Sequence, residues 1–588
     1  MPSPISDQYG IIENQNILLE QQAAENQKVQ SVVPVDDNQA KSQGPAASGD
    51  KISFSSTAQE LARHKEEPVD LADGQYKVAA EVPENSEAVT MASATMKSGR
   101  TLVIDRINTA PEEREKTNES LYGYRANVYK PGGELEFSFI MQRDTIFNEN
   151  EDGSLNVQDY VEGAETSGDD YIVGYEGKNM KGGAGDDTIV DLSGDKNVNQ
   201  RDIKNGGSSI DTGDGDDTVI LSKGEFGSVR NIDTGDGNDT VQAQGAIRDV
   251  DINTGAGNDV VQAKTHIMDS KLETGEGNDV VKLGGGVDFS DIDTGNGDDV
   301  ITANDGYYKS SVNTGRGNDI IRGNSFYGGA LDTAEGDDVI EAIVVKSIVS
   351  TGSGDDSMHG GIGQSVVDTG SGDDSIRGEG IIDSTVNTGS GDDRLNLTSG
   401  ISASVVNTEV GDDSITAKNT GHSTINTGSG DDSVSVEMGF IYSTINTGSG
   451  NDSVDGGKQT YASSINTGSG DDSISFSNAY ETSVKSGEGN DSLSFERLHY
   501  HSSVDMGDGD NSISGASVHD SSIESGSGSD RIILTGDVLN SLIEMGKGND
   551  YFKLAGNLIN TVLKMQEGDD LVHIEGNSTN SKISEGKG

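Results

Sequence analysis

The sequence predicts an all-β protein: a parallel β-solenoid of about 20 coils, preceded by a disordered N-terminal arm and a small β-rich cap. The main observation is a motif that returns about every 20 residues from Gly182 onward. Its order is apolar, Asx, Thr, Gly, any residue, Gly, Asp or Asn, Asp, small, apolar, as at 425–434 and 465–474. A short fixed period is typical of stacked coils rather than of a globular core.

Composition supports the same fold class. Hydrophobic residues make up 31% of the chain and aromatic residues 5%, whereas 80 of the 588 residues are glycine. This is little material for a broad core, and it fits a thin core spread along a stack. All eight prolines lie at or before Pro131, and proline is excluded from stacked sheets because it cannot donate a ladder hydrogen bond.

These observations divide the chain into three parts. Residues 1–100 are rich in Gln, Asn, Ser, Ala and Glu, which predicts a disordered arm with two candidate helical tracts at 16–29 and 58–67. Residues 101–167 form the predicted β-rich cap, with strands at 101–104, 122–129 and 134–141 and a turn at Pro131-Gly132-Gly133. Residues 168–588 form the predicted solenoid.

Each repeat carries two apolar positions flanked by polar residues, the alternation of a half-buried strand. We therefore expect two short strands per coil, each with one column of inward apolar residues. The first column precedes the glycines, at Ile210, Ile232, Ile252, Leu272, Ile292, Val312, Ile425, Ile445 and Ile465. The second follows the last Asp, at Val219, Val241, Val261, Val281, Ile301, Ile321, Val434, Val454 and Ile474.

The glycines and the acidic residues between these strands predict a cation site. Two glycines permit a tight corner with positive φ, and their carbonyls lie beside the carboxylates. Calcium prefers six to eight such oxygens, magnesium demands stricter geometry, and zinc favours Cys or His. Cysteine is absent and the eight histidines keep no repeat register, so calcium is the expected ion. The expected ligands are Asp187, Asp217, Asp239, Asp259, Asp279, Asp299, Asp319, Asp338, Asp356, Asp374, Asp393, Asp413, Asp432, Asp452, Asp472, Asp491, Asp530, Asp550 and Asp570.

The net charge of -60 excludes partners that require a basic surface, such as nucleic acid or an anionic membrane surface. No apolar run is long enough to span a bilayer. Stacked carboxylates repel one another without cations, so we expect folding to depend on calcium. Residues 1–30 have no basic stretch followed by an apolar run, which predicts export without a cleaved signal peptide.

The segment 182–190 (Gly-Gly-Ala-Gly-Asp-Asp-Thr-Ile-Val) fits Gly-Gly-x-Gly-x-Asp-x-apolar-x at every position. It resembles the hemolysin-type (RTX) calcium-binding repeat, and later repeats are similar with Thr-Gly in place of Gly-Gly. The resemblance covers about 170–588 and implies a right-handed parallel β-roll with calcium between stacked corners. It also implies a secreted bacterial protein, often exported through a type I channel.

The sequence departs from that family at three points. Only one corner of each coil carries the motif, so we expect one calcium column rather than two. Asn511 replaces the aspartate in one repeat, and Ala334, Glu409-Val410 and Gln566-Glu567 disturb the glycines, which predicts weaker sites there. No separate export segment follows the repeats, and the polar N-terminus would also suit an injected type III effector.

The expected role is structural, adhesive or partner-binding, at the cell surface or outside the cell. The variable corners at 439–442, 478–480 and 498–500 would be presented to a host or surface glycan or protein. Two further readings stay open. An ice-binding solenoid needs an outward array built from the Thr column, although alternation from the inward Ile points that column inward. A carbohydrate-active β-helix enzyme needs a unique catalytic cluster, but every Asp pair is repeated and no convergent constellation is visible, so we expect no enzyme activity.

Overall fold

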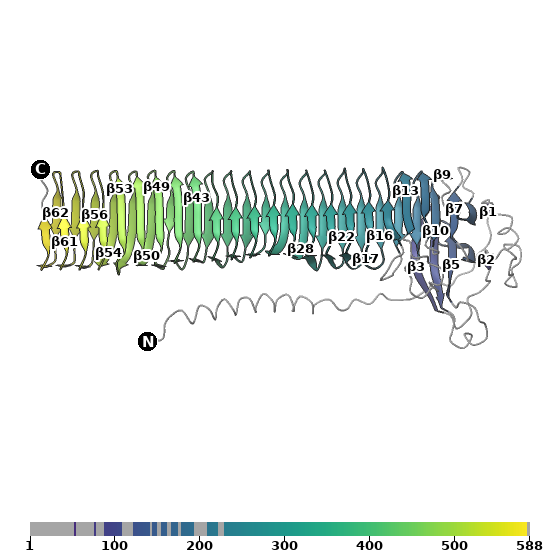
Figure 1. Cartoon of the computed structure of the whole chain (residues 1–588), viewed down its shortest axis with the longest axis horizontal. Coiled ribbons are helices and arrows are strands. Elements are labelled where there is room, and N and C mark those ends of the chain that lie inside the picture. The colour runs from purple at the N-terminus through teal and green to yellow at the C-terminus, as the bar shows by residue number, and fades with distance from the viewer. Residues whose placement is uncertain are drawn as a thin grey trace. The chain divides into compact units, whose positions relative to one another are not determined.

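The computed structural model describes residues 52–54, 76–77, 87–108, 122–141, 144–149, 155–161, 166–174, 178–192, 208–221 and 229–584. Every regular element within these ranges is a β-strand, and none is a helix. The coils stack in parallel along one axis (Figure 1), which confirms the predicted β-solenoid. The candidate helical tracts at 16–29 and 58–67 and most of the predicted arm lie outside the described residues.

A single coil contains three short strands rather than the two we predicted. In one coil these are β41 (Ser414–Ala417), β42 (Asn419–Gly421) and β43 (Thr424–Ser429). The first two belong to one sheet and the third to a second sheet. Each strand pairs with the equivalent strand of the next coil in the same register, so that Ile415 lies opposite Val434 and Ile425 opposite Ile445. Every repeat position therefore forms a straight column along the stack.

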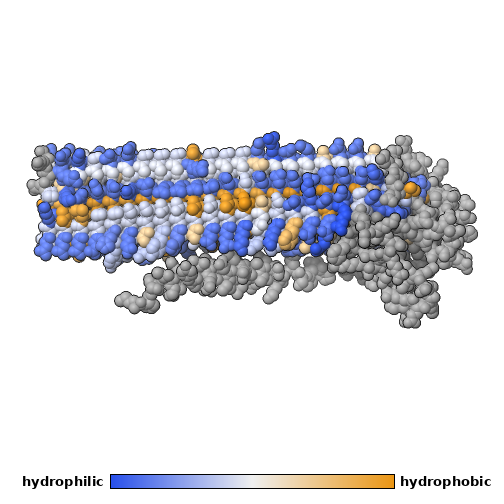
Figure 2. Space-filling view, viewed as in Figure 1, coloured by the Kyte–Doolittle hydropathy of each residue, from blue (hydrophilic) through white to orange (hydrophobic). Residues whose placement is uncertain are grey.

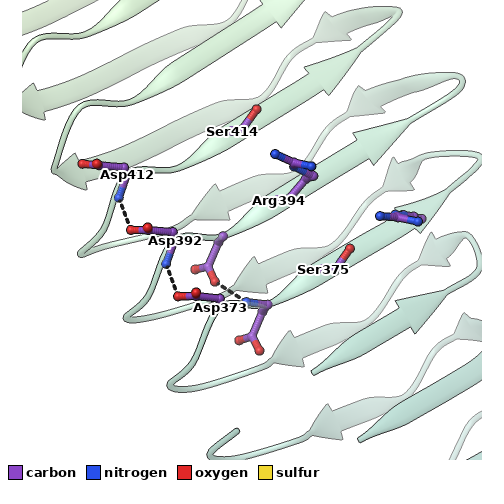
Figure 3. Close-up of a pocket in the computed structure, with 9 residues that line it drawn as sticks. Asp373, Ser375, Asp392, Arg394, Asp412 and Ser414 are labelled. Atoms are coloured by element: carbon purple, nitrogen blue, oxygen red, sulfur yellow. Dashed lines mark hydrogen bonds between the residues drawn. The ribbon is translucent and has the colours of Figure 1, made fainter. Parts of the chain in front are cut away.

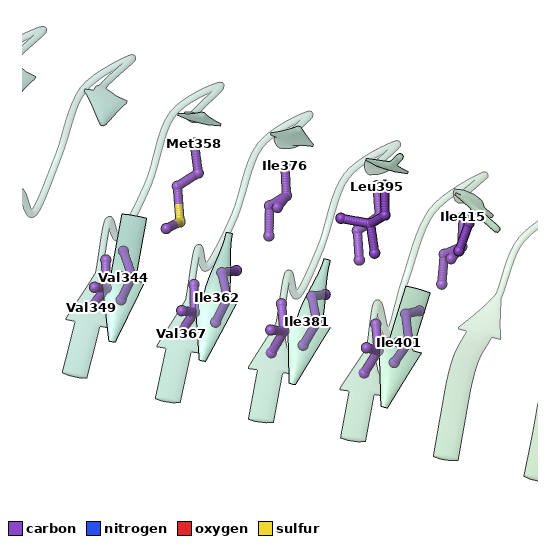
Figure 4. Close-up of a cluster of buried hydrophobic side chains, with 14 of the residues drawn as sticks. Val344, Val349, Met358, Ile362, Val367, Ile376, Ile381, Leu395, Ile401 and Ile415 are labelled. Carbon is purple, nitrogen blue, oxygen red and sulfur yellow. The ribbon is translucent and has the colours of Figure 1, made fainter. Parts of the chain in front are cut away.

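The core consists of three apolar columns (Figure 4). Two are the predicted ones, and all eighteen of their named residues are buried. The third comes from the second strand of each coil and was missed in the sequence. Its members in the middle of the stack are Val344, Ile362, Ile381 and Ile401, which lie beside the first column and face the second across the coil.

The glycine corner has the backbone conformation that we predicted. At the corner formed by the end of β43, φ is 105° at Gly428 and 138° at Gly430. A Cβ on Gly428 would lie 1.9 Å from the carbonyl oxygen of Glu409 in the preceding coil, so a side chain does not fit without a shift. The first glycine is replaced at Ala334, Glu409 and Gln566, and these residues keep positive φ values of 62°, 67° and 63°.

The three strands that we predicted in the cap are present as β4, β5 and β6 of a larger sheet. An antiparallel sheet has the order β2 (Tyr76–Lys77), β6 (Leu135–Met141), β5 (Tyr122–Tyr129), β4 (Thr101–Asn108) and β3 (Glu87–Thr95). Strand β3 falls inside the predicted arm, so the boundary at residue 100 was set too late. Its residues are mainly Ala, Ser and Thr, and its strand structure comes from pairing with β4 along its whole length.

The cap covers the first coils of the solenoid. Strand β7 (Thr145–Glu149) pairs antiparallel with β10 (Asp170–Gly174), and β10 pairs parallel with β12 (Thr188–Asp191) of the next coil. The outer face of this sheet is apolar here, and it packs in one cluster with the cap sheet. The hydroxyl of Tyr124 donates to the carbonyl of Leu192 at 3.3 Å across this junction.

The surface of the described coils is polar and regular. Figure 2 shows stripes that run along the stack, because each outward repeat position lines up with its equivalents. Apolar colour on this face is confined to narrow, interrupted stripes. The solenoid therefore presents long columns of one residue type, and a change of type within a column marks a local feature.

Candidate cation-binding column

The predicted ligands form one continuous column at the glycine corner. Eighteen of the nineteen aspartates are at most 2% exposed, and Asp570 in the last described coil is half-buried. The column also includes Asp170 at 2% exposure. We did not predict this member, because the sequence before Asp170 lacks the first glycine of the corner motif. The carboxylates thus lie inside the corner and not on the surface.

Backbone hydrogen bonds fix each carboxylate in place. The N–H of each column aspartate from Asp187 to Asp550 donates to Oδ1 of the equivalent residue in the next coil, for example from Asp393 to Asp413 at 2.9 Å and from Asp413 to Asp432 at 2.9 Å. The second oxygen, Oδ2, is buried and accepts no hydrogen bond from the described residues in eighteen members of the column, Asp187 to Asp491, Asp530 and Asp550. A buried carboxylate oxygen without a partner carries a high free-energy cost.

Asn511 identifies what surrounds that second oxygen. Its Oδ1 accepts the N–H of Asp491 at 2.9 Å, as an aspartate would. Its Nδ2 takes the position of Oδ2 and donates to the carbonyl of Ser525 at 3.0 Å and of Gly507 at 3.4 Å. The equivalent Oδ2 of an aspartate therefore faces backbone carbonyl oxygens. Oxygens that face one another need a proton or a cation between them.

Burial makes these carboxylates hard to ionise. It raises the pKa of Asp187 to about 8 and the pKa of Asp239 and Asp299 to about 7, because the charged form loses hydration. Repulsion from neighbouring column carboxylates raises the pKa further. The hydrogen bond from the preceding backbone N–H and the polar side chain of the nearby Thr lower the pKa and so act in the opposite direction.

The donor set fits a hard cation. Within the described part of the chain, the ion pairs of Lys, Arg and His go to other acidic residues, such as Asp211, Asp249 and Glu341, and none goes to one of the nineteen predicted ligands. The available ligands at each corner are carboxylate and carbonyl oxygens, which calcium prefers. The described residues contain no cluster of three or more His, Cys, Asp or Glu side chains that could hold a metal, so a cation here would need backbone carbonyls as well.

The Thr column lies inside the stack, as alternation indicated. Its members from Thr212 to Thr467 are buried, and most of their hydroxyls donate along the stack, for example from Thr427 to the carbonyl of Thr447 at 3.2 Å. These threonines do not form the outward array that the ice-binding reading requires. A second, exposed Asx column runs outside the aspartates, with its own ladder from Asp412 N–H to Asp392 Oδ1 at 2.9 Å.

The variable corners are only partly available to a partner. Phe440, Ala479 and Leu498 belong to the third apolar column and are fully buried, so the expectation that they are presented was wrong. Tyr442 and Tyr500 are exposed and His499 stacks on Tyr480 with ring centroids 5.4 Å apart. A third strand with one inward residue explains the difference, since only alternate residues of this corner face solvent.

No protein-family model and no curated protein matches this sequence. The described residues contain no helix that is both long and apolar enough to cross a membrane.

Proposed function

We propose that this protein is a calcium-binding repeat protein whose solenoid folds when the aspartate column binds calcium. The observation that carries the proposal is the run of buried Oδ2 atoms that face carbonyl oxygens. At Asn511, by contrast, the side-chain amide donates to the equivalent carbonyls, so that coil needs no ion. Calcium at each corner would join carboxylate and carbonyl oxygens and neutralise the charge that burial disfavours.

The chain's own residues supply the rest of this function. The glycines bring the carbonyls of adjacent coils close together, and the backbone N–H of each aspartate orients the next carboxylate. Binding only to the folded state stabilises that state by mass action. Oxygen sites of this kind in extracellular modules bind calcium at about 0.1–1 mM. We therefore propose a secreted or cell-surface protein with a structural or adhesive role.

The test is a calcium titration of the purified chain from excess chelator, followed by far-UV circular dichroism. We expect a cooperative transition from coil to β-structure that calcium produces and magnesium does not. Isothermal titration should place calcium binding in the same concentration range as the transition. A β-spectrum that is already complete in chelator, with no heat of calcium binding, would refute the proposal.

A further inference from the structure

A surface hollow of about 380 Å³ lies on the outer face of the sheet in the middle of the stack. It spans the adjacent strands β35 (Ser375–Gly378), β38 (Arg394–Leu397) and β41, beside their glycine corners (Figure 3). Arg394 lies between Ser375 and Ser414, its register partners on the two neighbouring strands. The short side chains of Ser375 and Ser414 leave space on either side of Arg394, and the guanidinium of Arg394 borders that space.

A second arginine lies on the same face. Arg377 is two residues beyond Ser375 on β35, so it is a diagonal neighbour of Arg394. Diagonal positions on adjacent strands are about 7–8 Å apart, within reach of two long side chains. Both arginines are exposed, and among the described residues neither forms an ion pair. By contrast, Arg322 contacts Glu341 at 2.8 Å in the same sheet.

The other walls of the hollow carry hydrogen-bond acceptors and hydroxyls. Asp373, Asp392 and Asp412 belong to the exposed Asx column, and each uses Oδ1 to accept the N–H of the next coil, at 2.8, 2.9 and 2.7 Å. The second oxygen of each carboxylate can accept from a ligand. The Oγ of Ser375 is buried and has no hydrogen-bond partner within the described ranges.

We propose that this hollow binds a hexuronate unit of an acidic saccharide. Guanidinium groups pair with a carboxylate through two parallel hydrogen bonds, and a single anion between Arg377 and Arg394 removes their mutual repulsion. The ring hydroxyls donate to Asp373 and Asp392. A polyphosphate suits the hollow less well, since its extra negative charge would meet the aspartate wall. Asp374 and Asp393 of the inward column border the hollow, but the groups proposed to hold the saccharide are outward side chains, so the site goes beyond the calcium role of that column.

The test compares binding of digalacturonate and of the neutral disaccharide cellobiose to the full chain in saturating calcium, by isothermal titration. The variant R394S/R377N puts at both positions the residues that neighbouring coils carry, Ser375 and Asn396, and should preserve the fold. We expect the variant to bind digalacturonate at least about tenfold more weakly, and the wild-type chain to prefer digalacturonate over cellobiose.

The matched control is R531S, because Arg531 occupies the same repeat position as Arg394 but packs over Tyr551 away from the hollow. It should bind digalacturonate as the wild-type chain does. Equal binding by R394S/R377N, equal binding of cellobiose, or no saturable binding to the wild-type chain would overturn the proposal. Acetate as competitor distinguishes two kinds of site. It should displace digalacturonate only weakly from a saccharide site, and it should displace it readily from a general carboxylate site. A calcium titration of the same variants reports on the calcium proposal separately.

Discussion

A single atom separates Asn511 from the other members of the column. Where an aspartate has Oδ2, Asn511 has an amide that donates to two carbonyls. The asparagine coil is therefore satisfied as a neutral structure, whereas each aspartate coil needs a proton or a cation. The exchange of one residue type for the other should change the number of ions bound without changing the fold.

We predict opposite effects for N511D and D413N. N511D should bind one more calcium and need a higher calcium concentration to fold, because it loses a neutral link worth about 1–3 kcal/mol. D413N should bind one calcium fewer and fold at a lower calcium concentration. Isothermal titration gives the stoichiometry and circular dichroism the folding midpoint. Unchanged stoichiometry in both variants would contradict this account of the column.

At the scale of the corner, backbone conformation decides which residues are tolerated. The first corner position has positive φ in every described coil, whether or not it is glycine. Residues with a Cβ are disfavoured in this region, because the side chain approaches the carbonyl oxygen. Ala334, Glu409 and Gln566 are therefore local weak points, although their coils keep the same aspartate ladder.

Replacing Glu409 by glycine should stabilise the calcium-loaded chain by about 0.5–1 kcal/mol. Glycine removes the strain of a positive φ, and this gain is partly offset because the unfolded chain has more conformational entropy with glycine. Urea unfolding in calcium measures the difference. G428A, at the equivalent position of the next coil, is the matched opposite change. It should destabilise the chain, since its Cβ would meet the carbonyl of Glu409. A destabilised E409G would show that the Glu409 side chain makes a favourable contact that outweighs strain.

Over the whole molecule, repulsion between negative charges opposes folding. The chain has a net charge of -60, and the column buries carboxylates one above another through the solenoid. Protons and calcium compete to neutralise the same oxygens. Without calcium, the buried carboxylates of the folded state have to be protonated. The same carboxylates have a lower pKa in the unfolded chain, so the stability of the whole stack depends on pH.

We predict that the chelated chain is more stable at pH 5 than at pH 8. The pKa of the column aspartates is raised from 3.8 to about 7 at Asp239 and to about 8 at Asp187. The folded state thus binds more protons than the unfolded state at pH values between 3.8 and these raised pKa values, and stability falls as pH rises from about 4 to about 8. Far-UV circular dichroism in chelator should show more β-structure at pH 5 than at pH 8, where we expect the chain to be mostly coil, and calcium should remove this pH dependence. A chelated chain that gains stability toward pH 8 would contradict the burial of ionisable carboxylates.

Much of this architecture could be predicted because the repeat fixes residue type at each position. Two apolar columns, the glycine corner and the aspartate register all follow from the period. The third column could not be recognised, since it is filled by residues as different as Tyr307, Phe326, Thr420 and Ala479. The diagonal placement of Arg377 and Arg394 on adjacent strands depends on strand register, which brings residues 17 apart in sequence near one another.

The register of the coils has a consequence for how such a chain can evolve. Each coil contacts its two neighbours through equivalent positions, so duplication of one whole repeat in the gene would add a coil that fits at once. An insertion of half a repeat would set aspartate beside serine and apolar residues beside glycine along the remaining stack. The length of this protein is therefore free to vary, but only in whole coils.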